Sequence, residues 1–147
     1  MASRILFVCL GNICRSPAAE GVMRQLAPQL VLDSAGTSDW EIGSPPYGPM
    51  QRAARARGYD LSGLRARQVE AEDFHRFDRI YAMDGDNLRR LETLRPAADG
   101  AALARLLDLL PDEPARDVPD PYYTRDFEGA LDLVEAACKA LCRDLGV

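Results

Sequence analysis

Short apolar runs alternate with amphipathic segments along the chain. Residues 4–9 form a β-prone run without a polar face, which is typical of a strand buried on both sides. Shorter runs at residues 31–35 and 79–83 predict two further strands. A fourth strand is expected around residues 106–109, although this stretch could equally extend a preceding Ala-rich helix.

Helical periodicity occupies the segments between these runs. Ser16 at the N-cap, Pro17 at the first helical position and regularly spaced apolar residues predict a helix over residues 17–30. Apolar residues at steps of four and three predict a long amphipathic helix from Phe127 to Leu145. Further helices are expected at residues 50–57, 70–76 and 87–94.

The alternation of strands and helices indicates an α/β fold. Strands that alternate with helices imply a parallel sheet with right-handed crossovers and with helices on both faces. Ligands of such sheets bind beyond the carboxyl ends of the strands, where the loop after residues 4–9 begins. The length of 147 residues and the 47% hydrophobic content predict one domain over residues 1–147.

Charge and cysteine content narrow the classes of partner. The net charge of -5 argues against nucleic acid, which requires a sustained basic face. The apolar run at residues 5–10 is too short for a signal segment or a membrane span, so we expect a cytoplasmic protein without a membrane partner. The four cysteines are interpreted as thiols, and their spacing together with the single His75 predicts no metal or cofactor. His75 itself is interpreted as a surface helix residue.

The segment from Cys9 to Ser16 is a candidate phosphate loop. The spacing Cys-x5-Arg is weak alone, but here it lies between a buried strand and a capped helix, where successive backbone N–H groups can surround an anion. Gly11 lacks a Cβ and Asn12 tolerates left-handed angles, so the loop can curve as required. The residues expected to bind phosphate are Leu10, Gly11, Asn12, Ile13, Cys14 and Ser16.

The same loop would make Cys9 a nucleophile. Inward N–H dipoles, the helix N-terminus and Arg15 all favour the thiolate. Arg15 would bind two phosphate oxygens as a planar fork, and Ser16 could donate a hydrogen bond to the Cys9 sulfur. The alternative is that Cys9 is a small buried residue and Arg15 a surface charge. For Cys14, packing and a role as a resolving thiol both remain open.

The run from Val8 to Pro17 resembles the signature of the low-molecular-weight protein tyrosine phosphatases. Residues 120–123, Asp-Pro-Tyr-Tyr, resemble that family's acid loop, and the likeness continues through residues 34–37 and 83–84. The resemblance implies a three-layer fold with a four-stranded parallel sheet and the phosphate loop after its first strand. It also implies a phosphotyrosine protein or small aryl phosphate as substrate, inorganic phosphate as product, and a monomer or weak homodimer.

The resemblance assigns catalytic roles as well. It implies that Cys9 attacks phosphorus, that Arg15 and the loop amides bind the phosphoryl oxygens, and that Asp120 protonates the leaving phenol and then activates water. Two flanking prolines hold Asp120 stiffly, which suits a positioned acid, whereas the rival Asp117 lacks them.

Aromatic residues are expected to wall the slot for an aryl group, because rings stack well on rings. Packing in the core is the alternative for each of them. The flanking carboxylates of Asp39, Glu41 and Glu128 could make the rim acidic and favour basic peptide substrates. The expected walls are Trp40, Tyr122 and Tyr123.

Two positions depart from the family's pattern. Leu64 stands where many members carry a histidine that braces the phosphate loop. The hydrogen bonds of Asn12 are therefore expected from Ser34 or Ser38, or the loop is less firmly held. Tyr47 lies in an altered segment and is expected to reshape the rim of the slot.

Two other functions would use a similar loop. A thioredoxin-coupled arsenate reductase needs further redox cysteines, but none lies between Cys14 and Cys138, and Cys138 and Cys142 on one helix make a poor disulfide. A phosphate- or phosphotyrosine-binding module would have an intact cradle and a displaced acid. The phosphatase is preferred because Asp120 keeps its loop.

Overall fold

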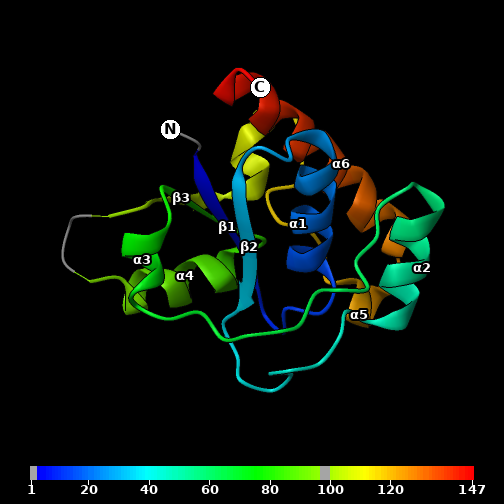
Figure 1. Cartoon of the computed structure of the whole chain (residues 1–147), viewed down its shortest axis with the longest axis horizontal. Coiled ribbons are helices and arrows are strands. Elements are labelled where there is room, and N and C mark those ends of the chain that lie inside the picture. Colours follow the sequence, from blue (N-terminus) through cyan, green and yellow to red (C-terminus); the bar gives the residue numbers. More distant parts are fainter. Residues whose placement is uncertain (1–2, 97–99) are drawn as a thin grey trace.

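A four-stranded parallel sheet forms the centre of the computed structural model, which describes residues 3–96 and 100–147 (Figure 1). The spatial order is β2-β1-β3-β4, and β1 pairs in parallel with both β2 and β3. The carboxyl end of β1 at Cys9 therefore lies in the middle of the sheet edge, as expected. The strands are β1 (Arg4–Cys9), β2 (Val31–Gly36), β3 (Arg79–Ala82) and β4 (Ala102–Arg105).

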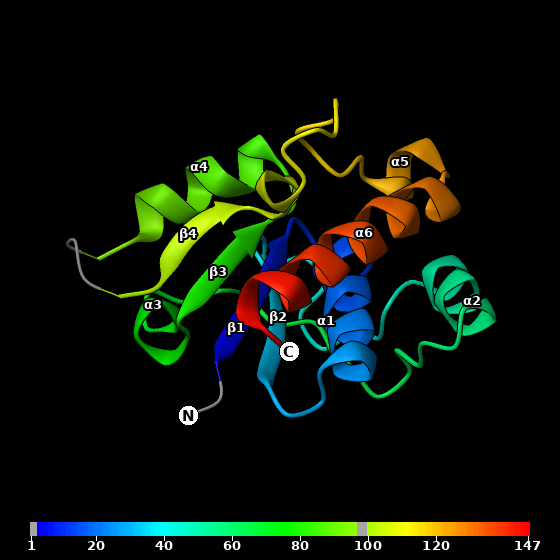
Figure 2. The same ribbon diagram turned by 90° about the horizontal axis from the view of Figure 1, so that it is seen from above.

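Helices cover both faces of this sheet, which gives the expected three layers (Figure 2). Ile5 and Phe7 of β1 pack on one face with α1, α2 and α6, whereas Leu6 and Val8 pack on the other with α3 and α4. All four side chains are fully buried, which explains why the run that contains them has no polar face. The helices are α1 (Arg15–Leu26), α2 (Gly48–Ala56), α3 (Asp73–Arg76), α4 (Gly85–Leu94), α5 (Pro121–Thr124) and α6 (Phe127–Leu145).

The fourth strand was predicted at the wrong residues. β4 lies at Ala102–Arg105, and residues 106–109 form instead a turn of 3-10 helix, η1 (Leu106–Leu109). Leu106 and Leu107 are fully buried in the core that α1 and α6 share, so their apolar character reflects packing of a helical turn. Pairing with β3 makes residues 102–105 a strand, although their composition favours a helix.

The first helix also differs from its prediction. It begins at Arg15 and ends at Leu26, earlier at both ends than the expected residues 17–30. Cys14 occupies the N-cap position and no side chain caps the helix, so the prediction of Ser16 as N-cap was wrong. The Ser16 hydroxyl is buried and lies within hydrogen-bond distance of the Cys9 sulfur instead.

His75 lies exposed on the short helix α3, as expected. Within residues 3–96 and 100–147, no helix is both long and apolar enough to cross a membrane. The same residues contain no cluster of three or more His, Cys, Asp or Glu side chains placed to hold a metal ion.

Candidate active site

The loop that joins β1 to α1 curves around the sulfur of Cys9. The amide of Asn12 donates to Cys9 Sγ over 3.3 Å, and Ser16 Oγ lies 3.0 Å from the same atom. Asn12 has a φ of 57°, in the left-handed region that its short polar side chain tolerates. The curvature and the contact between Ser16 and Cys9 were both predicted. Two polar groups of the loop therefore lie within hydrogen-bond distance of this sulfur.

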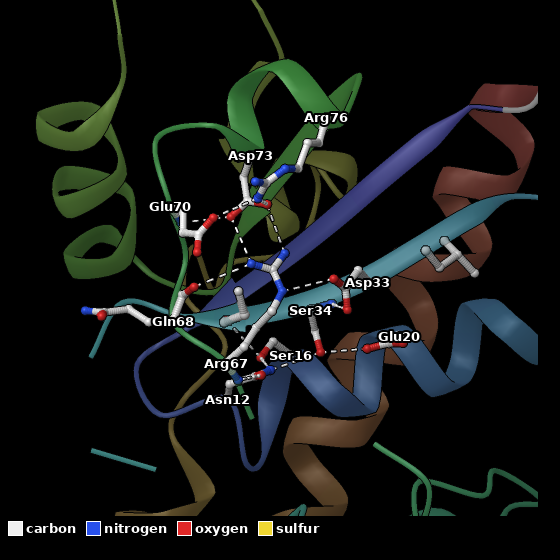
Figure 3. A network of polar contacts seen from close by, with 12 residues as sticks. Asn12, Ser16, Glu20, Asp33, Ser34, Arg67, Gln68, Glu70, Asp73 and Arg76 are labelled. Atoms are coloured by element: carbon white, nitrogen blue, oxygen red, sulfur yellow. Dashed lines mark hydrogen bonds and ion pairs between the residues drawn. The ribbon is translucent and has the colours of Figure 1, made fainter. Parts of the chain in front are cut away.

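The side chain of Asn12 braces this loop from behind (Figure 3). Its amide nitrogen donates to Ser16 Oγ over 2.8 Å and to Ser34 Oγ over 2.9 Å, and its oxygen accepts from the backbone N–H of Arg67 over 3.0 Å. The prediction that Ser34 forms a hydrogen bond with Asn12 is confirmed. Ser38 instead donates to the carbonyl of Leu10, so it supports the loop at another point.

The brace continues outward through a buried carboxylate. Ser34 donates its hydroxyl to Glu20 over 2.7 Å, and Glu20 accepts two further bonds from the guanidinium of Arg24. Burial raises the pKa of Glu20, against the opposing effect of the bonds from Ser34 and Arg24. The i,i+4 spacing of Glu20 and Arg24 on α1 was the available signal for this pair.

Arg67 fixes the other side of the brace. Its guanidinium donates to Asp33 over 3.0 Å and to both carboxylate oxygens of the fully buried Asp73 over 3.0 Å (Figure 3). The segment whose amide bonds Asn12 is thereby tied to β2 and α3. Nothing local in the sequence identifies these pairs, because their partners lie on separate elements.

Arg15 is buried at the start of α1, with 2% of its surface exposed. Nη1 donates to Asp84 over 2.7 Å and to the carbonyl of Val118 over 2.9 Å, and Nη2 donates to Asp120 over 3.2 Å. Burial opposes the charge of Arg15, but Cys9, Asp120 and Asp84 outweigh it and raise the pKa of the guanidinium. The interpretation of Arg15 as a surface charge is therefore wrong.

Asp120 lies on the opposite wall from the phosphate loop. It caps α5 by accepting from the backbone N–H of Tyr122 over 3.1 Å, and its side chain is 21% exposed. Asp117 accepts from the amide of Gly85 and lies 3.7 Å from Arg105, away from the cavity lining. Of the two rivals, only Asp120 has a carboxylate that reaches Arg15.

A cavity of about 160 Å³ joins these elements. Trp40 is 71% exposed and Tyr123 is 67% exposed, so packing in the core does not explain them. Glu41 adds one carboxylate to the lining, whereas Glu128 pairs with Arg57. The lining residues are Cys9, Leu10, Gly11, Ile13, Cys14, Arg15, Trp40, Glu41, Asp120, Tyr122 and Tyr123.

The sequence prediction and the cavity differ in two residues of the loop. Asn12 and Ser16 were expected to bind phosphate, but neither lines the cavity. Their side chains lie behind the loop and bond each other, and the Ser16 hydroxyl also lies within hydrogen-bond distance of the Cys9 sulfur. Cys14 does line the cavity, and burial raises the pKa of its thiol to about 12. For Cys14, packing and a role as a resolving thiol both stay predictions.

The model of the family described as low molecular weight phosphotyrosine protein phosphatase matches residues 4–146. The chain belongs to this family. It therefore hydrolyses phosphotyrosine and releases inorganic phosphate. The match favours the phosphatase over the two alternatives with a similar loop.

Relatives of the same family cover almost the whole chain. The low molecular weight protein-tyrosine-phosphatase YfkJ of Bacillus subtilis is 43% identical over 93% of this chain and 92% of its own. The crystal structure of YfkJ has a TM-score of 0.94 at 40% identity, covering 99% of this chain and 96% of that one. A protein tyrosine phosphatase from Entamoeba histolytica, solved with Hepes in the active site, has a TM-score of 0.91 at 37% identity, covering 99% and 97%.

Asp84 belongs to this phosphatase site, although no role was predicted for it from the sequence. Asp84 lies two residues after the end of β3 at Ala82, so its carboxylate reaches Arg15 from the neighbouring strand end. The rule that parallel strands present ligands at their carboxyl ends was the available signal. The carbonyl of Val118, which also accepts from Arg15, gives no signal in the sequence because any residue type supplies one.

Proposed function

We propose that this phosphatase acts through a phosphocysteine on Cys9, with Arg15 binding the phosphoryl group and Asp120 serving as acid and base. The observation that carries the proposal is convergence: all three side chains line one cavity, and Arg15 bonds Asp120 directly over 3.2 Å. The three residues come from the end of β1, the start of α1 and the cap of α5. Side chains from separate elements that meet in one cavity are typical of a catalytic centre.

In the first step the Cys9 thiolate forms a bond to phosphorus while the bond from phosphorus to the phenolic oxygen breaks. Protonated Asp120 gives its proton to the leaving oxygen. In the second step water attacks phosphorus, Asp120 takes the proton of that water, and the S–P bond breaks. Inorganic phosphate leaves and Cys9 returns as a thiolate, with Ser16 Oγ 3.0 Å from its sulfur to stabilise the departing charge.

Arg15 is suited to bind the phosphoryl oxygens. Among the residues that the structure describes, its buried Nε has no hydrogen-bond partner. A buried guanidinium donor without an acceptor is costly, so a phosphoryl oxygen that accepts from it gains binding energy. The amides of the loop, one of which already points at Cys9 Sγ, complete the cradle.

The cavity walls support an aryl phosphate rather than an alkyl phosphate as the preferred substrate. Trp40, Tyr122 and Tyr123 surround the mouth with exposed rings, on which a phenyl ring stacks well. Glu41 adds an acidic group, which favours basic residues beside the phosphotyrosine of a peptide. The proposed substrate class is a phosphotyrosine-containing protein or a small aryl phosphate.

The proposal also covers the domain organisation, the cellular compartment and the partners of the enzyme. Residues 1–147 act as one domain, because one sheet carries the apolar clusters on both its faces. All four cysteines are free thiols, which supports a reducing compartment such as the cytoplasm. The net charge of -5 supports a protein without a nucleic-acid or membrane partner. The protein acts as a monomer or weak homodimer, since the chain alone supplies every group of the mechanism.

Turnover of para-nitrophenyl phosphate tests this mechanism. Cys9→Ser should abolish turnover, and mass spectrometry of acid-quenched wild type should detect a phosphoryl group on Cys9. Cys142→Ser is the matched control, because Cys142 is a free, partly buried thiol on α6 and should not affect the rate. Full activity of Cys9→Ser, or a phosphoryl group on another residue, would contradict the mechanism.

A further inference from the structure

Tyr47 and Arg125 connect two loops that border the catalytic cavity. Tyr47 immediately precedes α2, and Arg125 immediately follows α5. Arg125 Nη1 donates to the hydroxyl of Tyr47 over 3.0 Å. The guanidinium carbon of Arg125 also lies 5.3 Å from the centroid of the Tyr47 ring and 5.2 Å from that of Phe127. At these distances a cation is attracted by both rings.

Arg125 has a backbone conformation that is unfavourable for most residues. Arg125 has a φ of 64°, in the left-handed region where a residue with a Cβ is uncommon and glycine is favoured. It ends α5, with its amide donating to the carbonyl of Pro121 over 2.9 Å. The contacts of the Arg125 side chain with Tyr47 and Phe127 offset the unfavourable energy of this backbone conformation.

Tyr47 reaches both the phosphate loop and the aromatic wall. Its backbone N–H donates to the carbonyl of Ile13 over 2.8 Å. Its ring lies 5.2 Å from the ring of Tyr122, tilted by 55°. Arg125 adds a second bond to the same wall, from Nη1 to the carbonyl of Tyr122 over 3.3 Å. The pair therefore links the loop that binds phosphate to the wall that faces the aryl group.

The element fixed by these contacts is weak on its own. The helix α5 has four residues, a single turn, and an isolated turn of helix is unstable. It nevertheless carries Tyr122, and Asp120 is its N-cap. Contacts from outside the turn must therefore determine where both residues lie.

We propose that Tyr47 and Arg125 are positioning residues that set the distance between the Tyr122 wall and the phosphate cradle. The identity of the cavity rests on the proposed function. Within that cavity, this contact selects aryl phosphates over phosphate alone.

The hydrogen bond between Tyr47 and the cradle runs from its backbone N–H to the carbonyl of Ile13, and side-chain substitutions preserve it. Arg15 keeps its bonds to Asp84 and to the carbonyl of Val118 when α5 moves, so loss of the contact should weaken binding of the aryl group and leave binding of inorganic phosphate unchanged.

Fluorescence of Trp40 measures both affinities without turnover. Trp40 is the only tryptophan of the chain, and it lines the cavity. The probes are phenylphosphonate, which carries an aryl group, and inorganic phosphate, which does not. The variants are Tyr47→Phe, which removes one hydrogen bond, Arg125→Gly, which removes the whole contact and also relieves the left-handed backbone, and their combination.

Arg125→Gly should raise the Kd of phenylphosphonate about fivefold to tenfold, and Tyr47→Phe about twofold to threefold. The Kd of inorganic phosphate should change by less than about twofold in both. The combined variant should resemble Arg125→Gly, because both substitutions break the same contact. Since glycine suits the backbone at this position, weaker binding by Arg125→Gly cannot be assigned to misfolding.

Tyr81→Phe provides a matched control. The hydroxyl of Tyr81 accepts from Arg79 Nη1 over 3.1 Å, the same kind of bond, but Arg79 begins β3, at the sheet edge opposite the catalytic loops. This variant should bind both probes as wild type does. Equal weakening of both probes by Arg125→Gly, or no change in either, would overturn the proposal.

Failure of the positioning proposal can be distinguished from failure of the mechanism. The fluorescence measurement requires no turnover, so it tests the positioning role even if Cys9→Ser retains full activity. Conversely, activity that depends on Cys9, together with unchanged affinities in the Tyr47 and Arg125 variants, rejects the positioning role alone.

Discussion

Arg15 and Asp84 form an ion pair of 2.7 Å behind the catalytic cavity. Asp84 also caps α4, because its second oxygen accepts from the backbone N–H of Asn87 over 2.8 Å. One carboxylate thus connects the guanidinium that binds phosphate to a helix end on the opposite face of the sheet. The guanidinium is held in place before substrate arrives, which is what efficient stabilisation of a transition state requires.

Asp84→Asn tests this arrangement. Asparagine caps a helix as well as aspartate does, so α4 should persist, but the charge that orients Arg15 is lost. We expect kcat/KM for para-nitrophenyl phosphate to fall about tenfold, because a small displacement of a phosphate-binding group is costly. Asp86→Asn, in the first turn of the same helix, is the control and should retain wild-type kinetics. Unchanged kinetics in Asp84→Asn would show that the remaining contacts suffice to orient Arg15.

Asp120 has two roles that different substitutions separate. Asp120→Asn keeps the cap on the backbone N–H of Tyr122 but cannot donate a proton as an acid, whereas Asp120→Ala loses both. With phenyl phosphate, whose leaving group is poor, kcat/KM of Asp120→Asn, which reports the first step and not hydrolysis of the phosphocysteine, should fall by about a hundredfold or more. With para-nitrophenyl phosphate the loss should be much smaller, because that leaving group needs little protonation. An equal loss for both substrates would indicate damage to α5 instead.

The site could be predicted from the sequence where it is local. Cys9 and Arg15 lie at the two ends of one loop between adjacent elements, so spacing and context were sufficient. The contact of Asn12 with Ser34 was predicted only because Leu64 replaced an expected partner. Asp84 received no role, because its partner lies far along the chain and its position follows only once β3 is placed beside β1.

The fourth strand shows the same limit for the fold. β4 consists of Ala102, Leu103, Ala104 and Arg105, which are residues that favour helices. Hydrogen bonding to β3 determines their conformation, and local propensity carries no information about that pairing. The apolar residues 106–109, which looked more like a strand, are buried by packing against the helices instead.

The buried carboxylate of Glu20 should make stability depend on pH. Burial raises the pKa of Glu20 in the folded protein above its ordinary value of 4.5. As the pH rises from that value through the folded-state pKa, the folded protein holds a proton that the unfolded chain has lost. The free energy of unfolding therefore falls over this window and levels off above it.

Glu20→Gln removes this titration. The free energy of unfolding of the variant minus that of wild type should rise across the same window, measured by urea denaturation at a series of pH values. Glu92→Gln, an exposed substitution on α4, is the surface control. A difference that falls with rising pH would mean that the bonds from Ser34 and Arg24 outweigh burial.

Gly36 ends β2 where the chain passes closest to the phosphate loop. A Cβ at this position would lie 2.8 Å from the carbonyl oxygen of Leu10 and 3.2 Å from the amide nitrogen of Asn12. Both atoms belong to the backbone of the loop, so neither can turn aside as a side chain would. Gly36 cannot move away from the loop either, because its backbone is held by two hydrogen bonds. Its N–H donates to the carbonyl of Arg67 and its carbonyl accepts from the N–H of Val69, each over 2.8 Å.

Gly36→Ala should therefore displace the phosphate loop. We expect kcat/KM for para-nitrophenyl phosphate to fall between about tenfold and a hundredfold, because the amides and Cys9 would no longer fit the transition state together. Stability should fall by about 1–3 kcal/mol from the added methyl group. Gly63→Ala is the matched control, since a Cβ there meets no atom within 4 Å. Wild-type phosphate binding and turnover in Gly36→Ala, as expected for Gly63→Ala, would contradict this prediction. The loop could then move away from the added methyl group despite its hydrogen bonds to Asn12.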